Sequence, residues 1–447
     1  MAMKKKPVTG MKDILPKEMA IRDYCIGLIK ETYKTFGFTS VETPCVEHIE
    51  NLSSNQGGEN EKLIFKILKR GDKLTGAVDK LIKTGTKSVP DADKAEASNI
   101  DNETGLDIDV STLSDSGLRY DLTLPLSRYY SNNANDLPSP FKALQMGNVW
   151  RADRPQRGRY RQFMQCDIDI LGESSILAEI ELILATTTLL GKLDFKNFTI
   201  RINDRRILKA MAAYSGFPEN DYDTVFIILD KMDKIGLDGV KEELLGCGYS
   251  SEAVDKYLNL FDKATGDIEG VRFIKDELGD YLDTEVSDNL ETIITSVENA
   301  KAADFKMQFD PTLVRGMSYY TGPIFEISMD EYGGSVGGGG RYDEMIGKFI
   351  GTPTPACGFS IGFERIIMLL LENDFKVPGE GEKKAYLVEK GMPSDKLLKI
   401  LEKAKEERAD GKSVNVVVMK KNKKFQKDQM AAEGYTEFVE FFKDRDI

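Results

Sequence analysis

Two strand-like segments joined by an arginine-rich loop constrain the fold of this chain more than any other feature. ALQMGNVWR (143–151) and QFMQCDIDI (162–170) both favour β-strands, and the loop between them contains Pro155 and Gly158. The simplest arrangement is a hairpin with a long loop. Side chains alternate between the faces of a strand. One face of the second strand therefore carries Phe163, Gln165, Asp167 and Asp169, while Met164, Cys166, Ile168 and Ile170 face a core.

The loop concentrates positive charge in a chain of 447 residues whose formal net charge is −13. Within eleven positions it carries Arg151, Arg154, Arg157, Arg159 and Arg161. Guanidinium groups stay charged and bind two phosphate oxygens at once, and the ring of Phe163 is suited to stacking on a purine. The loop and Phe163 could therefore bind a nucleotide, or the hairpin could simply be charged and solvated. The hairpin alone does not decide between these two interpretations.

The chain contains one histidine, His48, and five scattered cysteines without a C-x2-C pair. A single histidine excludes histidine-cluster metal sites and argues against Ser-His-Asp or Cys-His catalysis. The cysteine pattern is typical of reduced thiols in a cytoplasmic protein. The longest purely apolar run, 366–371, is too short to span a bilayer, and residues 1–10 lack the apolar stretch of a secretory signal.

Hydrophobic spacing predicts the order of the remaining elements. A helix is expected at 17–36, strands at 117–124 and 197–203, a helix at 174–193, and a charged helical region at 205–305. Residues 70–116 are polar and are expected to form a surface insertion. After a linker at 377–383, the pattern changes to a β-α-β-α-β alternation that predicts a small parallel α/β domain.

Three segments in the second half of the chain add candidate binding residues. LVRGMSYYTGPIFEI (313–327) places Arg315 and two tyrosines before a strand. GGGGRYDEM (337–345) contains a glycine run that is either a flexible turn or a place where the backbone approaches a ligand. ACGFSIGFERI (356–366) ends a strand and starts a helix near Gly362, with Arg365 in its first turn. A cation there is unfavourable unless an anion or a planar base lies nearby.

With these segments the chain resembles histidyl-tRNA synthetases, a family of class II aminoacyl-tRNA synthetases. WRADRPQRGRYRQFMQCDIDILG resembles motif 2 of that class, GFSIGFERI resembles motif 3, and TSVETPCVE resembles motif 1. LVRGMSYYTG and GGGGRYDEM resemble the two segments that distinguish the histidine enzyme, and GMKDILP and LRYDLTLPLSRYY match as well. The match runs from residue 10 to about 370, interrupted at 70–116.

The resemblance implies an α+β fold: a six-stranded antiparallel catalytic sheet with flanking helices, a helical insertion and a small C-terminal parallel α/β domain. The expected division is a first catalytic part at 1–204, with the polar insertion at about 70–116, and a helical insertion domain at 205–305. A second catalytic part follows at 306–376, then the linker at 377–383 and a shortened anticodon-binding-like domain at 384–447.

The resemblance also implies roles for individual residues. Arg315 and Arg151 would be catalytic, with Arg151 contacting the α-phosphate and the amino-acid carboxylate. The expected ATP-binding residues are Arg151, Asp153, Phe163 and Arg365. The expected histidine-binding residues are Asp121, Thr123, Arg151, Gln165, Asp169, Arg315, Tyr319 and Tyr320. No metal ligand is assigned to the protein; Mg²⁺ would accompany ATP.

The family ligates histidine to tRNA(His) with ATP, so ATP, L-histidine and tRNA(His) are the expected partners, in a cytoplasmic homodimer without membrane association. Two features depart from the family pattern: Ser318 stands where aspartate is usual, and the C-terminal domain has room for only three strands and two helices. The shortened domain leaves an alternative, a non-catalytic regulatory subunit of ATP phosphoribosyltransferase. A different class II synthetase would require the LVRGMSYYTG segment to be accidental.

Overall fold

The computed structural model describes residues 3–56, 60–85, 110–314, 319–379 and 382–447. The chain forms two compact units, residues 1–12 with 27–369 and residues 13–26 with 370–447. Helix α1 (Pro16–Thr35) and helix α13 (Phe363–Glu372) each contribute residues to both units. Within the described ranges, no helix combines the length and the apolar character that a membrane crossing requires.

The largest sheet of the described chain has eight strands in the order β1-β5-β6-β11-β10-β9-β7-β8. They are β1 (Thr39–Val41), β5 (Phe141–Trp150), β6 (Gln162–Leu171), β7 (Phe198–Asp204), β8 (Phe305–Phe309), β9 (Pro323–Met329), β10 (Gly334–Arg341) and β11 (Ala356–Ile361). The six inner strands pair antiparallel with one another, which confirms the predicted antiparallel sheet. The edge strands β1 and β8 pair in parallel with β5 and β7 and extend the sheet beyond the six predicted strands.

The predicted hairpin is formed by β5 and β6. Their antiparallel register runs from Phe141 opposite Leu171 to Trp150 opposite Gln162. The alternation is confirmed for Cys166, Ile168 and Ile170, which are at most 1% exposed in the core of the first unit. It is wrong for Met164 at the start of the strand, which is half-buried and lines a cavity instead of the core. The opposite face of β6 is therefore not needed for this core and can line a binding site.

The glycine run lies within strand β10, so the flexible-turn alternative is wrong. A Cβ atom on Gly339 would lie 1.9 Å from the carbonyl oxygen of Gly358 on β11. Side chains at this point would force the two strands apart, because real Cβ atoms do not approach backbone so closely. A bulge between Ser335 and Gly337 interrupts the pairing of β10 with β9.

The end of β10 is fixed by a buried ion pair with helix α5 (Leu177–Lys192). The guanidinium of Arg341 donates to both carboxylate oxygens of Glu179, at 2.6 and 2.8 Å, and Glu179 is fully buried. Arg341 also donates to the carbonyl oxygens of Glu173 and Ser175, both at 3.0 Å. Because Arg341 is buried, water does not reach its guanidinium, and these two carbonyl oxygens accept from the N–H groups that Glu179 leaves unpaired.

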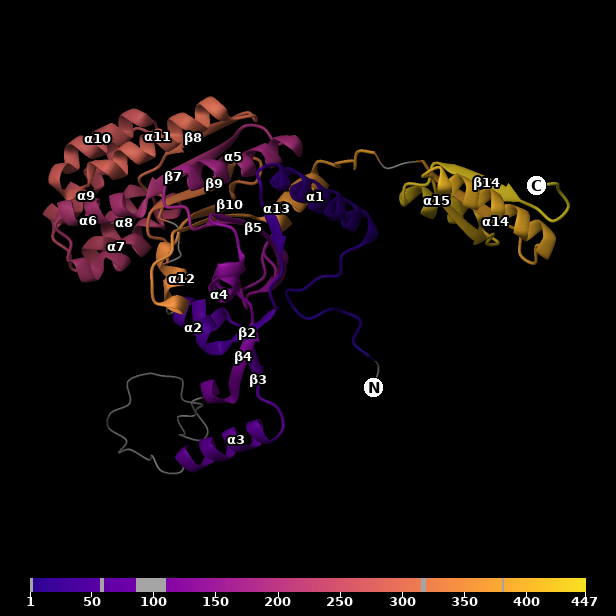
Figure 1. Cartoon of the computed structure of the whole chain (residues 1–447), viewed down its shortest axis with the longest axis horizontal. Helices are drawn as coiled ribbons and strands as arrows, with labels where there is room; N and C mark the ends of the chain where they lie inside the picture. The colour runs from indigo at the N-terminus through magenta and orange to yellow at the C-terminus, as the bar shows by residue number, and fades with distance from the viewer. Residues whose placement is uncertain (1–2, 57–59, 86–109, 315–318, 380–381) are drawn as a thin grey trace. The chain divides into compact units, whose positions relative to one another are not determined.

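Residues 205–300 are predominantly helical, as the charged periodic pattern predicted. The helices are α6 (Arg205–Ser215), α7 (Tyr222–Leu229), α8 (Met232–Gly246), α9 (Ser251–Lys263), α10 (Ile268–Leu278) and α11 (Thr284–Ala300), with short 3₁₀ turns at Glu219–Asp221 and Gly279–Tyr281. Figure 1 shows them gathered beside β7 and β8. Their status as a separate domain remains a prediction, as do the other predicted domain boundaries.

A second, three-stranded sheet of the first unit has the order β2-β4-β3. It consists of β2 (Val46–His48), β3 (Lys66–Leu68) and β4 (Ser114–Leu118), with α2 (Ile49–Gln56), α3 (Asp72–Gly85), and 3₁₀ turns at Asn60–Leu63 and Val110–Leu113. Part of the predicted polar insertion is thus the helix α3, and residues 86–109 lie outside the described residues. The polar composition hid the apolar spacing of Leu74, Val78 and Ile82.

The strand predicted at 117–124 is partly wrong, because β4 ends at Leu118 and helix α4 (Thr123–Asn133) begins five residues later. The carboxylate of Asp121 accepts a hydrogen bond from the backbone N–H of Leu124 at 3.2 Å. Pro125 lies in the first turn, where its missing N–H costs nothing. A 3₁₀ turn (Ala134–Asp136) follows α4, and α12 (Asp343–Ile350) packs against α4.

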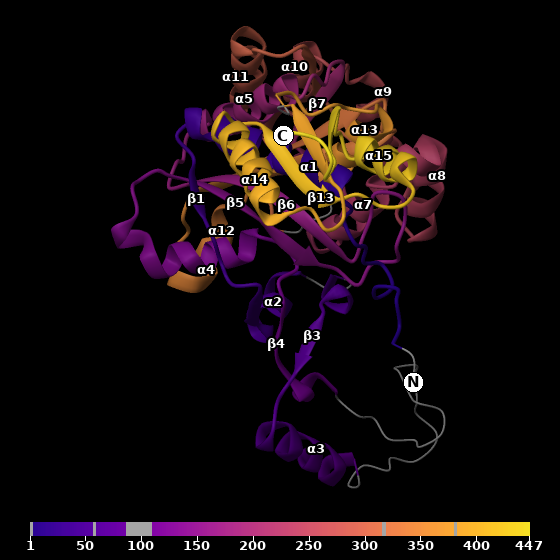
Figure 2. The same ribbon diagram turned by 90° about the vertical axis from the view of Figure 1, so that its right-hand side faces the viewer.

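Residues 383–441 form the predicted β-α-β-α-β alternation in the second unit. The elements are β12 (Lys383–Val388), α14 (Ser394–Ala409), β13 (Ser413–Val418), α15 (Lys423–Ala432) and β14 (Glu437–Phe441), and the parallel strands lie in the order β13-β12-β14. Ile400 of α14 packs with Tyr386, whereas Met430 of α15 packs with Leu387. The helices thus cover opposite faces of the sheet, as Figure 2 shows.

Candidate active site

A cavity of about 430 Å³ opens over the antiparallel sheet of the first unit. Its walls come from β6, β10 and β11, from the start of α13, and from the loops before α4 and β9. Every predicted site residue that the structure describes lines it: Asp121, Thr123, Arg151, Asp153, Phe163, Gln165, Asp169, Tyr319, Tyr320 and Arg365. Arg315 and Ser318 lie outside the described residues, so the statements about them remain predictions.

The guanidinium of Arg151, which directly follows β5, lies between two aromatic rings of the cavity wall. Its Cζ atom is 4.3 Å from the ring centroid of Tyr120 and 5.2 Å from that of Phe163. Its Nε donates to the carbonyl oxygen of Tyr120 at 3.1 Å. Stacking and this hydrogen bond hold the planar group in one orientation while its remaining N–H groups stay available.

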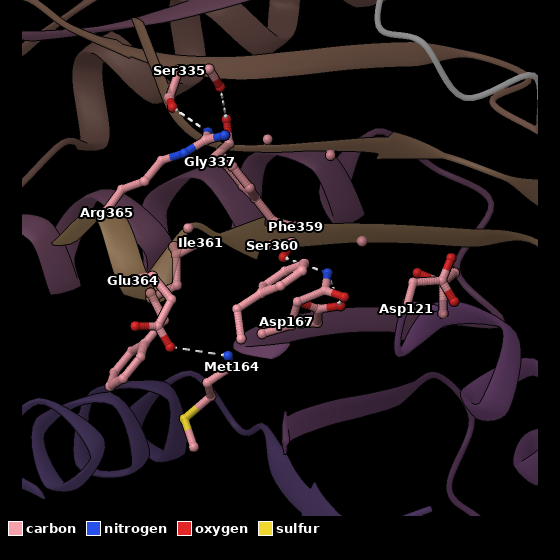
Figure 3. Close-up of a pocket in the computed structure, with 18 of the residues that line it drawn as sticks. Asp121, Met164, Asp167, Ser335, Gly337, Phe359, Ser360, Ile361, Glu364 and Arg365 are labelled. Carbon is pink, nitrogen blue, oxygen red and sulfur yellow. Dashed lines mark hydrogen bonds between the residues drawn. The ribbon is translucent and has the colours of Figure 1, made fainter. Parts of the chain in front are cut away.

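Arg365 and its neighbour Glu364 form one end of the cavity, on the left in Figure 3. The Arg365 guanidinium donates to the carbonyl oxygen of Ser335 and lies 5.5 Å from the ring centroid of Tyr332. Glu364 accepts a hydrogen bond from the backbone N–H of Met164 at 3.2 Å. The cation is therefore hydrogen-bonded to a carbonyl oxygen, which offsets its unfavourable position in the first turn of α13.

Buried carboxylates lie away from Arg365, and Figure 3 shows Asp167 near the middle of the view and Asp121 on the right. Asp121, Asp167 and Asp169 are each at most 4% exposed. Burial raises the pKa of Asp169 to about 7, assisted by the nearby Asp121 and opposed by a hydrogen bond from the hydroxyl of Tyr342 at 2.6 Å. Burial and the neighbouring Asp169 hold the pKa of Asp167 well above its ordinary value.

Aromatic rings enclose the space beside Asp169. The rings of Tyr319 and Tyr320 are 4.7 Å apart, and those of Tyr319 and Tyr342 meet edge to face at 6.1 Å. A further hydrogen bond links Tyr319 with Thr123. Planar apolar walls beside a carboxylate suit a flat ring that carries an N–H donor.

Several lining residues were not assigned a role by the sequence, namely Tyr120, Asp167, Tyr342, Ser360 and Glu364. Asp167 could have been assigned from the same alternation that identified Gln165 and Asp169. Ser360 lies opposite Asp167 on β11, and such cross-strand neighbours depend on a register that one chain segment does not reveal. Tyr342 lies in the GGGGRYDEM segment (337–345), in which only the glycine run was interpreted as a possible ligand contact.

The raised pKa of Asp169 predicts a pH-dependent stability difference for Asp169→Asn. The folded protein keeps this proton up to about pH 7, whereas an unfolded aspartate loses it near pH 4. This group therefore makes its full contribution to the free energy of unfolding below about pH 4. The contribution decreases as the pH rises from about 4 to about 7. The variant should gain about 2–5 °C in Tm relative to the parent between pH 5 and pH 8.

Thermal melts of both proteins at these two pH values check this prediction. Asp330→Asn, at an exposed carboxylate after β9, is the control and should show no change in relative Tm between them. Any constant cost of burying an amide cancels in this comparison. Equal relative Tm values of Asp169→Asn at pH 5 and pH 8 would contradict the raised pKa.

Known proteins match this chain over most of its length. A family model described as histidyl-tRNA synthetase matches residues 96–366. The chain is 42% identical over 440 residues to a histidine–tRNA ligase of Leifsonia xyli subsp. xyli, covering 97% of this chain and 94% of that protein.

Solved structures agree on the fold. A histidyl-tRNA synthetase from Nostoc sp. PCC 7120 has a TM-score of 0.72 at 26% identity, covering 97% of this chain and 90% of that one. A Bacillus halodurans protein described as an ATP phosphoribosyltransferase regulatory subunit/histidyl-tRNA synthetase has a TM-score of 0.74 at 20% identity, covering 98% and 99%. At that identity the second similarity shows the fold alone. Together with the family match and the Leifsonia relative, these findings show that the chain belongs to the histidyl-tRNA synthetase family.

Proposed function

We propose that the chain activates L-histidine with ATP and then transfers the histidyl group to the 3′ end of tRNA(His). The observation that carries this proposal is that the two parts of one cavity are lined by different kinds of side chain. Arginine and aromatic side chains suited to a nucleotide line one part, and buried carboxylates with tyrosine rings line the other. A ligand that joins a nucleotide to a small cationic side chain matches this arrangement.

The proposed roles follow the two ends of the cavity. Phe163 and Arg365 would enclose the adenine ring, with Asp153 near its amino group. Arg151 would contact both the α-phosphate and the histidine carboxylate, because its guanidinium is oriented and can bind two oxygens. Asp169 would accept the imidazole N–H between the rings of Tyr319 and Tyr320.

Asp121, Thr123 and Gln165 would complete the histidine-binding wall. In the activation step, the histidine carboxylate attacks the α-phosphorus, a new P–O bond forms and pyrophosphate leaves. The step requires no proton transfer, so fixed positive charge and positioning supply most of the acceleration. Arg315 would share this task with Arg151.

Mg²⁺ and the macromolecular partners belong to the same proposal. Mg²⁺ would arrive with ATP and be bound through phosphate oxygens, the ligands that it prefers. The second unit would contact tRNA, with exposed Lys420, Lys421 and Lys424 near α15, whereas Lys423 and Lys427 already form ion pairs with Glu440. A cytoplasmic homodimer assembled in part through the motif 1 segment completes the proposal.

Exchange of labelled pyrophosphate into ATP tests the activation step in the purified chain. We expect exchange that requires L-histidine and that does not occur with the other amino acids. Histidylation of tRNA(His) then tests the transfer step. A protein that binds histidine without supporting exchange would instead be the regulatory subunit that the sequence left as an alternative, and the proposal would be wrong.

A further inference from the structure

The GMKDILP segment (10–16) matches the family, and the roles proposed above do not use it. Residues 8–12, called the N-terminal turn below, belong to the first unit. A hydrogen bond of 2.9 Å from the backbone N–H of Met11 to the carbonyl oxygen of Val8 closes this turn. Gly10 lies inside it with φ of 84°, a left-handed conformation that favours glycine. The start of the segment therefore has a defined structure that the proposed function does not explain.

The N-terminal turn packs on the arginine-rich loop that follows β5. The backbone N–H of Arg161 donates to the carbonyl oxygen of Gly10 at 2.8 Å. The ammonium group of Lys12 lies 5.0 Å from the ring centroid of Tyr160, within the range of a cation–π contact. A Cβ atom on Gly10 would lie 2.7 and 2.8 Å from the Cγ and Cδ atoms of Arg161, and 3.0 Å from Cγ of Pro155. The contact therefore leaves no room for a side chain at Gly10.

Arg161 connects the N-terminal turn to two residues that are proposed to bind ATP. Just beyond the last residue pair of β5 and β6, the backbone N–H of Arg151 donates to the carbonyl oxygen of Arg161 at 2.9 Å. The Nε atom of Arg161 donates across the loop to the carbonyl oxygen of Asp153 at 3.1 Å. One residue thus joins Gly10 to both Arg151 and Asp153 through three hydrogen bonds.

Arg161 differs in its surroundings from the residues that it holds. Arg151, Asp153 and Tyr160 line the cavity, whereas Arg161 does not and is half-buried against the N-terminal turn. A loop that is already held in one arrangement loses less conformational entropy when a ligand binds, so it binds that ligand more tightly. The contacts of Arg161 are those expected of a residue that holds the loop.

We propose that the N-terminal turn holds the arginine-rich loop in position for ATP, and that Arg161 is the positioning residue through which it acts. This inference rests on the proposed function, which assigns ATP to Asp153 and Arg151. The guanidinium of Arg151 is also held by Tyr120, so the larger consequence of releasing the loop falls on Asp153. The histidine-binding wall comes mainly from β6 and from the segments before α4 and β9, so it should be affected less.

The test measures histidine-dependent pyrophosphate exchange in Gly10→Ala, with ATP and histidine varied separately. The added methyl group should push Arg161 and the loop away from the N-terminal turn. The KM for ATP should rise about 10- to 30-fold, because a displacement of about 1 Å is enough for losses of this size. The KM for histidine should change less than about threefold. A merely structural role would lower the amount of folded protein and leave both KM values unchanged.

A matched control separates the contact from backbone strain. Gly216 ends α6 with φ of 93°, and an added Cβ atom there meets no atom within 4 Å. Gly216→Ala therefore has the same kind of left-handed strain as Gly10→Ala without the contact to the loop. It should lower Tm but keep the parent KM for ATP and for histidine.

A double variant tests whether Gly10 acts through Arg161. Arg161→Ala removes the Cγ, Cδ and Nε atoms and should itself raise the KM for ATP about tenfold. Adding Gly10→Ala should then raise this KM by less than about threefold, because the atoms that the methyl group would displace are absent. If Gly10→Ala does not fold, Arg161→Met keeps an unbranched side chain, loses the Nε donor, and is measured in its place.

Three outcomes would overturn the assignment. The first is a parent-like KM for ATP in both the Gly10 and the Arg161 variants, and the second is an equal rise in both KM values. The third is a double variant in which the two effects multiply, since Gly10 and Arg161 would then act independently. Failure of the proposed function is distinguishable from all three, because the unmodified chain would then show no histidine-dependent exchange at all.

Discussion

Replacing Arg151 by alanine is expected to lower the rate of histidine-dependent pyrophosphate exchange by about 10²–10³. The guanidinium is held over the rings of Tyr120 and Phe163 and by the carbonyl oxygen of Tyr120, so it needs no reorientation when charge develops on the α-phosphate. Preorganised cations of this kind stabilise a transition state more than a mobile side chain does. Exchange rates at saturating ATP and histidine measure the effect.

Two further variants sharpen this prediction. Arg151→Lys keeps the charge but loses the planar, two-pronged group, so its rate should fall between those of the parent and the alanine variant. Arg154→Ala removes an exposed arginine of the same loop that does not line the cavity. Because exchange requires no tRNA, this control should retain the parent rate within about twofold. Equal losses in Arg151→Ala and Arg154→Ala would indicate a general effect of loop charge.

Gly358→Ala is expected to raise the KM for histidine by about 10²-fold or more. A Cβ atom at this position of β11 would lie 2.0 Å from Oδ1 of Asp169 and 3.2 Å from Cε1 of Tyr342. The carboxylate must therefore move and lose the hydrogen bond from the Tyr342 hydroxyl. Because the displaced atom ends a side chain, the stability cost should stay near that of ordinary overpacking, about 1–3 kcal/mol.

Histidine titrations of the exchange rate and urea unfolding measure these two effects separately. The control is Gly27→Ala, at an exposed position inside α1 where an added Cβ meets no atom within 4 Å. It should increase the free energy of unfolding by about 0.5–1 kcal/mol, as alanine does in helices. A parent-like KM in a folded Gly358→Ala protein would contradict the role proposed for the Asp169 carboxylate.

The features that the sequence predicted correctly are those encoded within one segment. Alternation along 162–170 was sufficient to predict the buried side of β6, and helical spacing was sufficient for the region after residue 205. The start of α4 was missed because a carboxylate at Asp121 and a proline two residues into the helix outweigh the strand-like residues before them. That residues from distant segments form one site was predicted from the family resemblance and not from periodicity.

Other features depend on contacts between segments that no local pattern records. The parallel edge strands β1 and β8 are defined only by the neighbours that they meet. For the glycines of β10 the sequence favoured a turn, because glycine is uncommon inside strands. Their use as strand residues becomes clear only when Gly358 of β11 lies against them. The presence of Ser360 and Tyr342 in the cavity likewise depends on the register of β11 and on the path of the chain after β10.

The buried pair of Arg341 and Glu179 has a consequence for the alignment of β10. A run of four glycines has no side chains that distinguish one register from the next, so strands of this composition are prone to slip. A slip of one residue would move Arg341 by about 3.3 Å along the strand and leave Glu179 fully buried without its partner. The ion pair at the end of β10 therefore fixes the register of a strand whose glycine sequence does not specify one.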